Sequence, residues 1–383
     1  MREGLSKRDV RSEDEMAFTN QEELQIDGRQ GEGGGQVLRT SLSLAAALGR
    51  PIRIENVRGG RKKPGLLRQH RTALRAVRDL TGGEIEGEEL GSTSVRFVPG
   101  MSCHGGNYHF GIGSAGSTML VLQTVLPPLL LADSPSTVML EGGTHNPAAP
   151  PFEMFAESFL PQLRAMGLGV EGTLLRPGFF PAGGGQLRVE IQPAGITRAL
   201  ELLARGAAGP KTCEVLVQNL ARSVSDREWK AFQKRSHWKS NQMSVREVRG
   251  GRGPGNVMSA RQAFENVTTV HASFGMRTVS SELVGSQLGG MVRGYDACDA
   301  PVCKHLADQL MLPLALFSGG TYRCVYVSEH TRTNADVINL FLPGAVSIEP
   351  EETTAPAARE NHGGRESARR GPALVRVAAR ALG

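Results

Sequence analysis

The chain is poor in two kinds of residue that many binding sites need. Aromatic residues make up 5% of its 383 residues, and there are five cysteines. With so few rings, base stacking on an aromatic platform is not expected to be the main binding device. The cysteines are odd in number and share no Cys-x-x-Cys spacing, so we expect reduced thiols with neither a disulfide framework nor a zinc site.

Long apolar runs are missing as well. The longest, Met119 to Ala132, is interrupted by Gln123, Thr124 and two prolines, so no membrane-spanning segment and no membrane partner are expected. The N-terminus carries mixed charges and lacks the apolar stretch of a signal peptide. These absences predict a cytoplasmic location.

Positive charge, by contrast, is abundant and unevenly distributed. The net charge is +6, yet the segment from Arg50 to Leu80 alone holds ten Lys and Arg against two acidic residues, an excess of eight. One local surface therefore holds the basic character of the chain, and a polyanion is the expected partner.

A glycine-rich run near the N-terminus carries a carboxylate and a guanidinium. Gly31-Glu32-Gly33-Gly34-Gly35-Gln36 precedes a segment that reads as a helix, with Arg39 inside it. Loop amides and a helix N-terminus together form an anion site, and a carboxylate beside bound phosphate indicates a divalent cation. The run lacks the Gly-Lys-Ser/Thr of a P-loop, and a tight strand-to-helix turn is the other interpretation.

A weak repeat indicates the organisation of the chain. A helix, a Gly turn and a short strand recur so that Glu86 and Glu171 lie 85 residues apart, and Glu171 and Glu349 lie 178 apart. The excess of 93 residues predicts a small module inserted in the last unit. We therefore expect repeated βα units at 23–202 and 300–349 and an inserted domain at 203–299.

Both ends of the chain differ from this pattern. Residues 1–22 are polar and charge-mixed, and 350–383 are rich in Pro, Ala, Gly and charge. We expect disordered tails over 1–22 and most of 350–383, with a short terminal element at 372–382.

The basic segment contains an expected helix after Pro64-Gly65, with Pro64 in its first turn. Four arginines step by three and four residues along one face of it. Such a face is often only solvated, but its neighbours make binding the favoured interpretation. The arginines are Arg68, Arg71, Arg75 and Arg78.

A second chemical cluster lies late in the chain, at His305 to Gln309 and at His330 to Asn334. Thr333 or Asn334 is expected to cap a helix that begins near Ala335, which would leave His330 at the end of the preceding strand. Strand ends that face a helix N-terminus often hold reacting groups in α/β proteins. A structural histidine is the alternative, and no His-x-x-x-His or His-Glu-x-x-His pair supports a zinc hydrolase.

Taken together and in order, these motifs resemble the RNA 3′-terminal phosphate cyclase family over about residues 24–349. The runs that match are Asp27-Gly28, Gly31 to Gln36 with Arg39, Arg58-Gly59-Gly60-Arg61, Pro64-Gly65-Leu66, Gln69-His70, Gly113-Ser114-Ala115-Gly116-Ser117, Gly142-Gly143-Thr144 with Asn146-Pro147 and Pro150, Phe180-Pro181-Ala182-Gly183-Gly184-Gly185, Gly253-Pro254-Gly255-Asn256, Ala307-Asp308-Gln309, and His330 with Thr333-Asn334.

The resemblance implies that the chain is an ATP-dependent enzyme that converts an RNA 3′-phosphate into a 2′,3′-cyclic phosphate. It implies that His330 attacks the α-phosphate of ATP, releases pyrophosphate and forms a covalent histidine–AMP. The AMP then passes to the RNA 3′-phosphate, and the vicinal 2′-OH displaces it. Adenylation gives the phosphate a leaving group and divides a hard step into easier ones.

The resemblance also implies roles for other residues. Glu32 is the expected ligand of Mg²⁺ or Mn²⁺. The expected adenylate pocket comprises Gln123, Pro150, His305, Leu306, Ala307, Asp308 and Gln309. The residues expected to bind the triphosphate and the RNA terminal phosphate are Arg39, Arg58, Arg61, Gln69 and His70.

The family fold resembles enolpyruvylshikimate-phosphate synthase, with repeated βα units, four-stranded sheets and a small inserted α/β domain. Two alternatives remain: a non-catalytic cyclase-like factor in ribosomal RNA processing, and a phosphate-binding transferase on the synthase fold. The presence of His330 argues against the first, since that branch lacks the histidine, and the local excess of eight positive charges argues against the second. The oligomeric state stays open, with a homodimer as one option.

Overall fold

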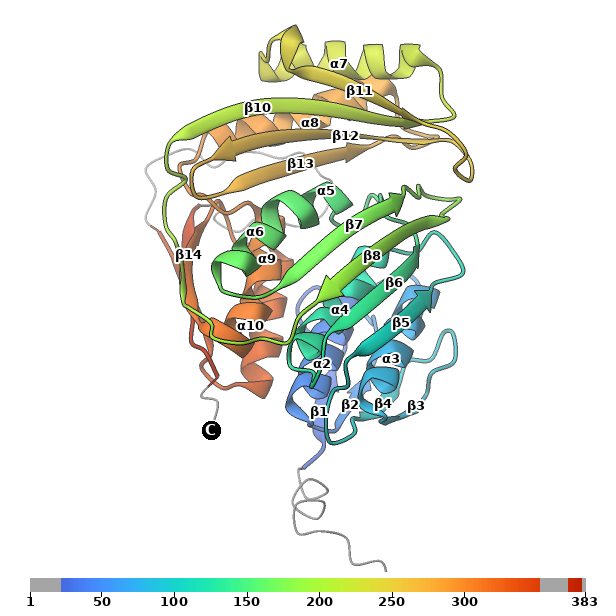
Figure 1. Ribbon diagram of the computed structural model, residues 1–383, viewed down its shortest axis with the longest axis vertical. Coiled ribbons are helices and arrows are strands. Elements are labelled where there is room, and N and C mark those ends of the chain that lie inside the picture. The colour runs from blue at the N-terminus through green and yellow to red at the C-terminus, as the bar shows by residue number, and fades with distance from the viewer. Residues whose placement is uncertain (1–21, 352–370, 381–383) are drawn as a thin grey trace, which may run out of the picture.

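The structure, a computed structural model, describes residues 22–351 and 371–380. The expected tails therefore lie largely outside the described residues, at 1–21, 352–370 and 381–383. The described chain forms a large part with three sheets and a smaller layer above it (Figure 1).

Three four-stranded sheets of the large part share one topology. In each, the first two strands in sequence pair in parallel, and the fourth strand pairs antiparallel with both the second and the third. The sheets are β1 (Leu24–Asp27), β2 (Ile52–Glu55), β4 (Val95–Val98) and β3 (Glu84–Glu86); β5 (Gly106–Gly111), β6 (Ser136–Gly142), β8 (Gly185–Ile191) and β7 (Val170–Arg176); and β9 (Leu200–Leu202), β14 (Gly320–Cys324), β16 (Ala373–Val377) and β15 (Val346–Pro350).

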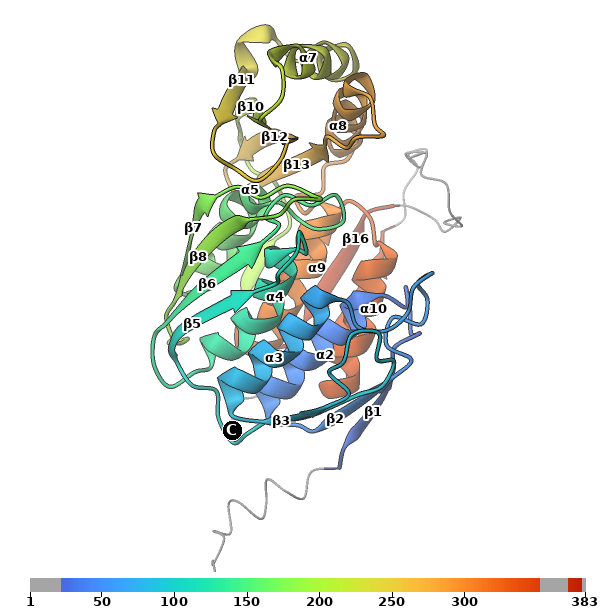
Figure 2. The ribbon, with the colours of Figure 1, turned by 90° about the vertical axis from the view of Figure 1, so that its right-hand side faces the viewer.

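Helices connect the strands of each unit and gather in the centre of the large part, with the sheets outside them (Figure 2). Their facing sides are apolar; Leu42, Leu74, Val125, Leu310 and Val337 are fully buried there. These helical segments are α2 (Gly35–Leu48), α3 (Arg68–Thr81), α4 (Thr118–Leu130), the continuous α5 (Phe152–Met154), η1 (Phe155–Phe159) and α6 (Leu160–Ala165), the continuous α9 (Lys304–Pro313) and η3 (Leu314–Ser318), and α10 (Glu329–Phe341).

The smaller layer is inserted between β9 and α9 of the third unit. It holds one sheet of order β11-β10-β12-β13 and two helices packed on it, with Trp229, Phe232, Trp238 and Leu288 in its own apolar cluster. Its elements are β10 (Ala208–Gln218), α7 (Arg222–Ser236), η2 (Ser240–Gln242), β11 (Met243–Val248), β12 (Gly255–Phe264), β13 (Thr268–Phe274) and α8 (Ser281–Asp296). The predicted fold class, repeated βα units with four-stranded sheets and an inserted α/β layer, is confirmed.

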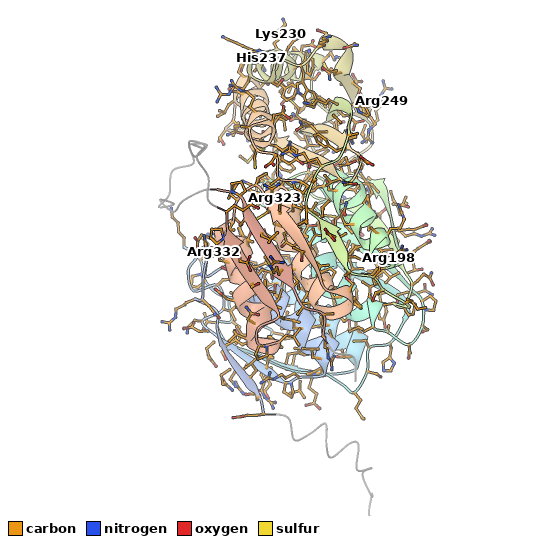
Figure 3. The ribbon with its side chains drawn as sticks, turned by 90° about the vertical axis from the view of Figure 1, so that its left-hand side faces the viewer. Arg198, Lys230, His237, Arg249, Arg323 and Arg332 are labelled. Carbon is orange, nitrogen blue, oxygen red and sulfur yellow. The ribbon has the colours of Figure 1, made fainter. Side chains whose placement is uncertain are left out.

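The C-terminal strand completes the third sheet. The terminal element expected at 372–382 is present as β16, which pairs with β14 on one side and β15 on the other. Near this sheet, Arg323 lies at the junction of the large part and the inserted layer (Figure 3). It pairs with Asp299 at 3.1 Å and with Glu351 at 2.7 Å.

Two predicted helix starts are wrong. α3 begins at Arg68, because the N–H of Gly65 bonds to the carbonyl of Val57 at 2.7 Å and holds Pro64 in a loop outside the helix. α10 begins at Glu329, because the Ser328 hydroxyl accepts a hydrogen bond from the N–H of Thr331 at 3.0 Å and caps it there.

His330 therefore lies in the first turn of α10 and not at a strand end, since β14 stops at Cys324. Thr333 and Asn334 lie in the second turn and are buried. Their side chains do not cap a helix; they form hydrogen bonds to other segments, Thr333 to the N–H of Glu32 and Asn334 to the carbonyl of Asp308.

Three predicted absences can be compared with the described residues. All five cysteines are free thiols. Within 22–351 and 371–380, no cluster of three or more His, Cys, Asp or Glu is arranged to hold a metal ion. Over the same residues, none of the helices has the length and apolar character needed to cross a membrane.

Candidate active site

The N-terminal ends of four helices of the large part meet at one place. At the start of α3, the Gln69 carbonyl Oε1 accepts a hydrogen bond from the N–H of Ser117, the cap of α4, at 2.9 Å. At the start of α2, Gln36 Nε2 donates to Asn334 Oδ1 of α10 at 3.1 Å. Helix N-termini carry partial positive charge and unpaired N–H groups, so this junction is suited to bind an anion.

The glycine run brings its carboxylate onto α10. Gly31 has φ = 58°, and a Cβ at this position would lie 2.0 Å from Thr333 Oγ1. The same hydroxyl accepts a hydrogen bond from the N–H of Glu32 at 3.0 Å. A residue with a side chain in place of Gly31 would push the two segments apart, so glycine is required for this contact.

Glu32 uses both carboxylate oxygens. Oε1 lies 3.3 Å from His330 Nδ1, and Oε2 accepts a hydrogen bond from Arg61. The Glu32 side chain is 10% exposed and that of His330 is 49% exposed, so the carboxylate is beneath and the imidazole faces outward.

The pair shifts both pKa values toward the charged forms. The hydrogen bond to Glu32 raises the pKa of His330, and the carboxylate charge adds to this effect. Burial alone would raise the pKa of Glu32, but the hydrogen bond from His330 and the charges of His330 and Arg61 lower it overall. In the neutral imidazole the same contact holds the proton on Nδ1, which leaves the lone pair of Nε2 free.

Arg39 and His70 form a buried donor pair beside this carboxylate. Arg39 is 9% exposed; its Nη2 donates to Gln36 Oε1 at 2.8 Å, and its Nε has no hydrogen-bond partner among the described residues. Burial lowers the pKa of Arg39 to about 10, so it stays protonated at neutral pH. A buried guanidinium with an unsatisfied N–H indicates a missing anionic partner.

His70 is neutral for a related reason. Burial and the charges of Arg39 and Arg58 lower its pKa to about 3. Its Nδ1 accepts a hydrogen bond from the N–H of Leu67 at 3.2 Å, which leaves Nε2 as the donor. That nitrogen lies 2.8 Å from where a Cβ on Gly35 would be, at the start of α2.

Arg58, unlike the other arginines predicted to bind phosphate, donates to backbone carbonyls of its own loop. It has φ = 56°, and its Nη1 donates to the carbonyls of Lys63 at 2.9 Å and Gly65 at 2.8 Å. In this arrangement Arg58 shapes the loop that carries Arg61. Its remaining guanidinium nitrogens are the groups that could reach a phosphate.

Asp308 connects the predicted pocket to α10. Its Oδ1 accepts a hydrogen bond from Thr331 Oγ1 at 2.5 Å, and its backbone carbonyl accepts one from Asn334 Nδ2 at 2.7 Å. Burial raises the pKa of Asp308 to about 6. Thr40 Oγ1 also donates to Asn334 Oδ1, at 2.7 Å, so the amide of Asn334 ties together α2, α9 and α10.

The sequence analysis missed the contributions of Gln36, Thr40 and Thr331. Gln36 and Thr331 stand in runs that were noticed, but no role was given to them, because each acts through a contact to another segment of the chain. Asn334 was noticed as a possible cap and as part of a matching run, without a contact assigned to it. Its burial in the second turn of α10, where an Asn weakens a helix, is evident only in the structure.

The other residues of the expected adenylate pocket lie on α9, on α4 and in the loop before α5. His305 is exposed on the first turn of α9, Gln123 is half-buried on α4, and Pro150 precedes α5. Gln309 has a buried Nε2 without a hydrogen-bond partner among the described residues. Leu306 and Ala307 are fully buried in the apolar core.

The fold and this junction define an α/β protein that gathers guanidinium groups, a carboxylate and an outward-facing imidazole around an anion site. The family model of the RNA 3′-terminal phosphate cyclases matches residues 30–348. The chain therefore belongs to the RNA 3′-terminal phosphate cyclase family, a family of enzymes.

Curated relatives agree with this assignment. RNA 3′-terminal phosphate cyclase of Salmonella agona is 44% identical over 326 residues, which cover 85% of this chain and 94% of that protein. The cyclases of Koribacter versatilis and Ralstonia nicotianae are 43% and 44% identical, over 87% and 86% of this chain and 94% of each relative.

Proposed function

We propose that this enzyme uses ATP to convert the 3′-phosphate of an RNA into a 2′,3′-cyclic phosphate, with His330 as the nucleophile. Family membership implies the use of ATP and an RNA substrate. The observation that carries the choice of nucleophile is the contact of His330 Nδ1 with Glu32 at 3.3 Å, at the junction of the helix N-termini.

In the first step, His330 Nε2 attacks the α-phosphorus of ATP. The bond from phosphorus to the bridging oxygen breaks, pyrophosphate leaves, and a covalent histidine–AMP forms. Glu32 supports this step because it holds the Nδ1 proton and stabilises the positive charge that develops on the ring.

The buried guanidinium of Arg39 and the N–H of neutral His70 are suited to the phosphate oxygens. They are desolvated, so their hydrogen bonds to an anion are strong. Arg61 pairs with Glu32, as His330 does, and its side chain is partly exposed. Its guanidinium can therefore contact a phosphate from the same position. We assign these three residues to the triphosphate and to the RNA 3′-phosphate in turn.

A divalent cation fits the site when nucleotide is bound. Mg²⁺ is usually held by one or two carboxylates together with substrate phosphates, and Glu32 is the carboxylate in position. Mg²⁺ or Mn²⁺ would supply charge neutralisation at the reacting phosphates. Asp308, whose pKa is raised to about 6, is better suited to hydrogen bonding in the nucleoside pocket.

In the second step, an oxygen of the RNA 3′-phosphate attacks the AMP phosphorus, and the bond to Nε2 breaks. In the third, the vicinal 2′-OH loses its proton, attacks the terminal phosphorus and displaces AMP as the ring closes. The residues that held the triphosphate are free to hold the RNA phosphate, because pyrophosphate has left.

Incubation with ATP labelled at the α-phosphate, and with Mg²⁺ or Mn²⁺, tests the nucleophile. We expect covalent label on the wild type and none on His330→Asn. His104→Asn is the matched control, since His104 is also an exposed histidine with Nδ1 3.2 Å from a carboxylate, that of Asp133.

Label that persists in His330→Asn would overturn the assignment of the nucleophile. A wild type that takes up no label would favour the alternative of a non-catalytic cyclase-like factor in ribosomal RNA processing.

A further inference from the structure

An exposed aromatic side chain lies close to the active site but outside it. Phe180, on the loop between β7 and β8, is 56% exposed, although aromatic residues are scarce and most others are packed inside. Its neighbour Phe179 is buried and stacks on His145, with ring centroids 5.2 Å apart. Phe179 thus anchors the loop, and Phe180 is presented to solvent on a supported backbone.

The loop of Phe180 is continuous with the predicted phosphate site. A Cβ on Gly183 would lie 2.9 Å from the Cα of Ala115, and a Cβ on Gly116 would lie 3.1 Å from Cβ of Gln69. Gln69 begins the helix that carries His70. An RNA strand whose 3′-phosphate lies at this site would therefore run past Gln69 to the exposed loop of Ser114 and then to Phe180.

Basic groups from two other segments contact the loop of Phe180 at Gly184. Arg176 Nε donates to the carbonyl of Gly184 at 2.6 Å, and the stem of Arg252 lies 2.7 Å from where a Cβ on Gly184 would be. Arg252 is exposed and forms no ion pair among the described residues, whereas Arg176 has only Glu141 at 4.0 Å. Their charges are available to a polyanion.

Arg252 belongs to the loop between β11 and β12 of the inserted layer. This loop and the end of β7 lie at the same edge of the molecule (Figure 1), and a Cβ on Gly253 would lie 2.9 Å from Cβ of Ala182. Arg249, also exposed, is on the same layer, whereas Lys230 and His237 lie at its outer end (Figure 3). The inserted layer thus adds the positive charge of Arg252 to the loop of Phe180.

We propose that Phe180, Arg176 and Arg252 form a subsite, here called the Phe180 rim, for the single-stranded RNA upstream of the 3′-phosphate. Phe180 stacks on a base, and the two guanidinium groups at Gly184 contact neighbouring backbone phosphates. This combination of a ring and a positively charged track is how proteins hold single strands without reading their sequence.

The Phe180 rim is consistent with the low aromatic content of the chain. Scarce aromatics predict that stacking is not the main binding device, and a single ring agrees with that. The arginines at the phosphate site would supply most of the affinity, and the rim would make it depend on RNA length. The inference rests on the proposed function, since it assumes that an RNA 3′-phosphate occupies the junction of the helix N-termini.

Binding of 3′-phosphorylated single-stranded RNAs of 2, 4, 6 and 10 nucleotides, measured without ATP on the full chain, tests the rim. We expect wild-type affinity to rise about 5-fold or more between 2 nucleotides and the longer RNAs, as one stacked base would give. Phe180→Ala should lose this gain and Phe180→Trp should keep it. Each variant should bind the dinucleotide with the affinity of the wild type, which shows that the variant is folded.

Charge variants provide the second arm. Arg252→Gln should reduce the salt dependence of binding to the longer RNAs by about 0.7 in the log–log slope, the loss of one single-strand phosphate contact. Lys230→Gln, which removes an exposed cation at the outer end of the inserted layer, is the matched control and should leave the slope unchanged. Ile196→Ala, at a 97% exposed apolar side chain, is the control for Phe180→Ala.

Persistence of the length-dependent gain in Phe180→Ala, or its absence from the wild type, would overturn the rim. Covalent labelling by ATP in the same wild-type preparation separates the two ideas. A labelled enzyme without length dependence refutes the rim alone, whereas an enzyme that neither takes label nor binds the dinucleotide refutes the proposed function.

Discussion

At the scale of single residues, the site depends on Glu32, whose two carboxylate oxygens contact different partners. One oxygen faces His330 and the other faces Arg61, and the side chain is nearly buried. A carboxylate with two cationic partners stays ionised, and it fixes which nitrogen of the imidazole carries the proton. Glu32 can therefore act as a positioning residue for His330, in addition to the metal-ligand role proposed for it.

This pairing predicts a pH dependence. Because Glu32 raises the pKa of His330, the imidazole keeps its proton above the ordinary histidine value, and the neutral nucleophile appears only at higher pH. We expect the NMR titration midpoint of His330 to fall in Glu32→Gln, and covalent labelling of the wild type to rise with pH through its own midpoint.

Glu88→Gln is the control for this titration, since Glu88 is also paired with an arginine, Arg75 at 2.8 Å, but on another surface. It should leave the His330 midpoint unchanged. An equal midpoint in the wild type and Glu32→Gln would show that the carboxylate does not hold the imidazole proton.

At the scale of elements, the position of His330, the proposed nucleophile, depends on where α10 begins. Ser328 caps the helix through Thr331, and this places His330 in the first turn. The same turn is tied to α9 by the bond from Thr331 to Asp308. A helix that started six residues later, as the sequence suggested, would have left His330 in a loop without this support.

Ser328→Ala tests the cap. Loss of an N-cap hydroxyl costs about 1 kcal/mol of stability, and here we also expect slower covalent labelling because the first turn frays around His330. Ser280→Ala is the matched control: Ser280 caps α8 of the inserted layer by accepting from the N–H of Leu283 at 3.2 Å.

Both variants should lose similar stability in denaturant unfolding, but only Ser328→Ala should slow labelling. Equal effects on labelling would mean that the cap acts through general stability and not through His330.

At the scale of the whole molecule, the third sheet is assembled from distant parts of the chain. β9 precedes the inserted layer, β14 follows it, and β16 pairs between β14 and β15 from beyond residue 370. β16 alternates strictly, with Ala373, Val375 and Val377 buried and Arg376 exposed. The buried residues of this strand belong to the same apolar core as the helices that carry the site.

Val375→Ala measures what the strand contributes. Val375 is fully buried, so removing two methyl groups should cost about 2 kcal/mol in the free energy of unfolding, measured with denaturant. Arg376→Ala, its exposed neighbour paired with Glu349 at 3.2 Å, should change stability by at most about 0.5 kcal/mol. A Val375→Ala variant as stable as the wild type would mean that the third sheet does not need this strand.

Many residues of the candidate site could be predicted from the sequence, because they stand in short motifs. The glycine run, Arg39 and the late histidine cluster all indicated a phosphate site, and the structure brings Glu32, Arg39, Arg61, His70 and His330 together. The repeat spacing also predicted an inserted segment at 203–299, because a helix, a turn and a strand leave a local pattern.

The sequence by itself determined the residue types at the site, the repeated units and the concentration of positive charge. Only the tertiary structure decided where α3 and α10 begin, how Thr333 meets the N–H of Glu32 across 301 residues, and where β16 pairs. Sequence patterns report contacts between residues a few positions apart. Contacts between distant segments arise only when burial of the shared core brings those segments together.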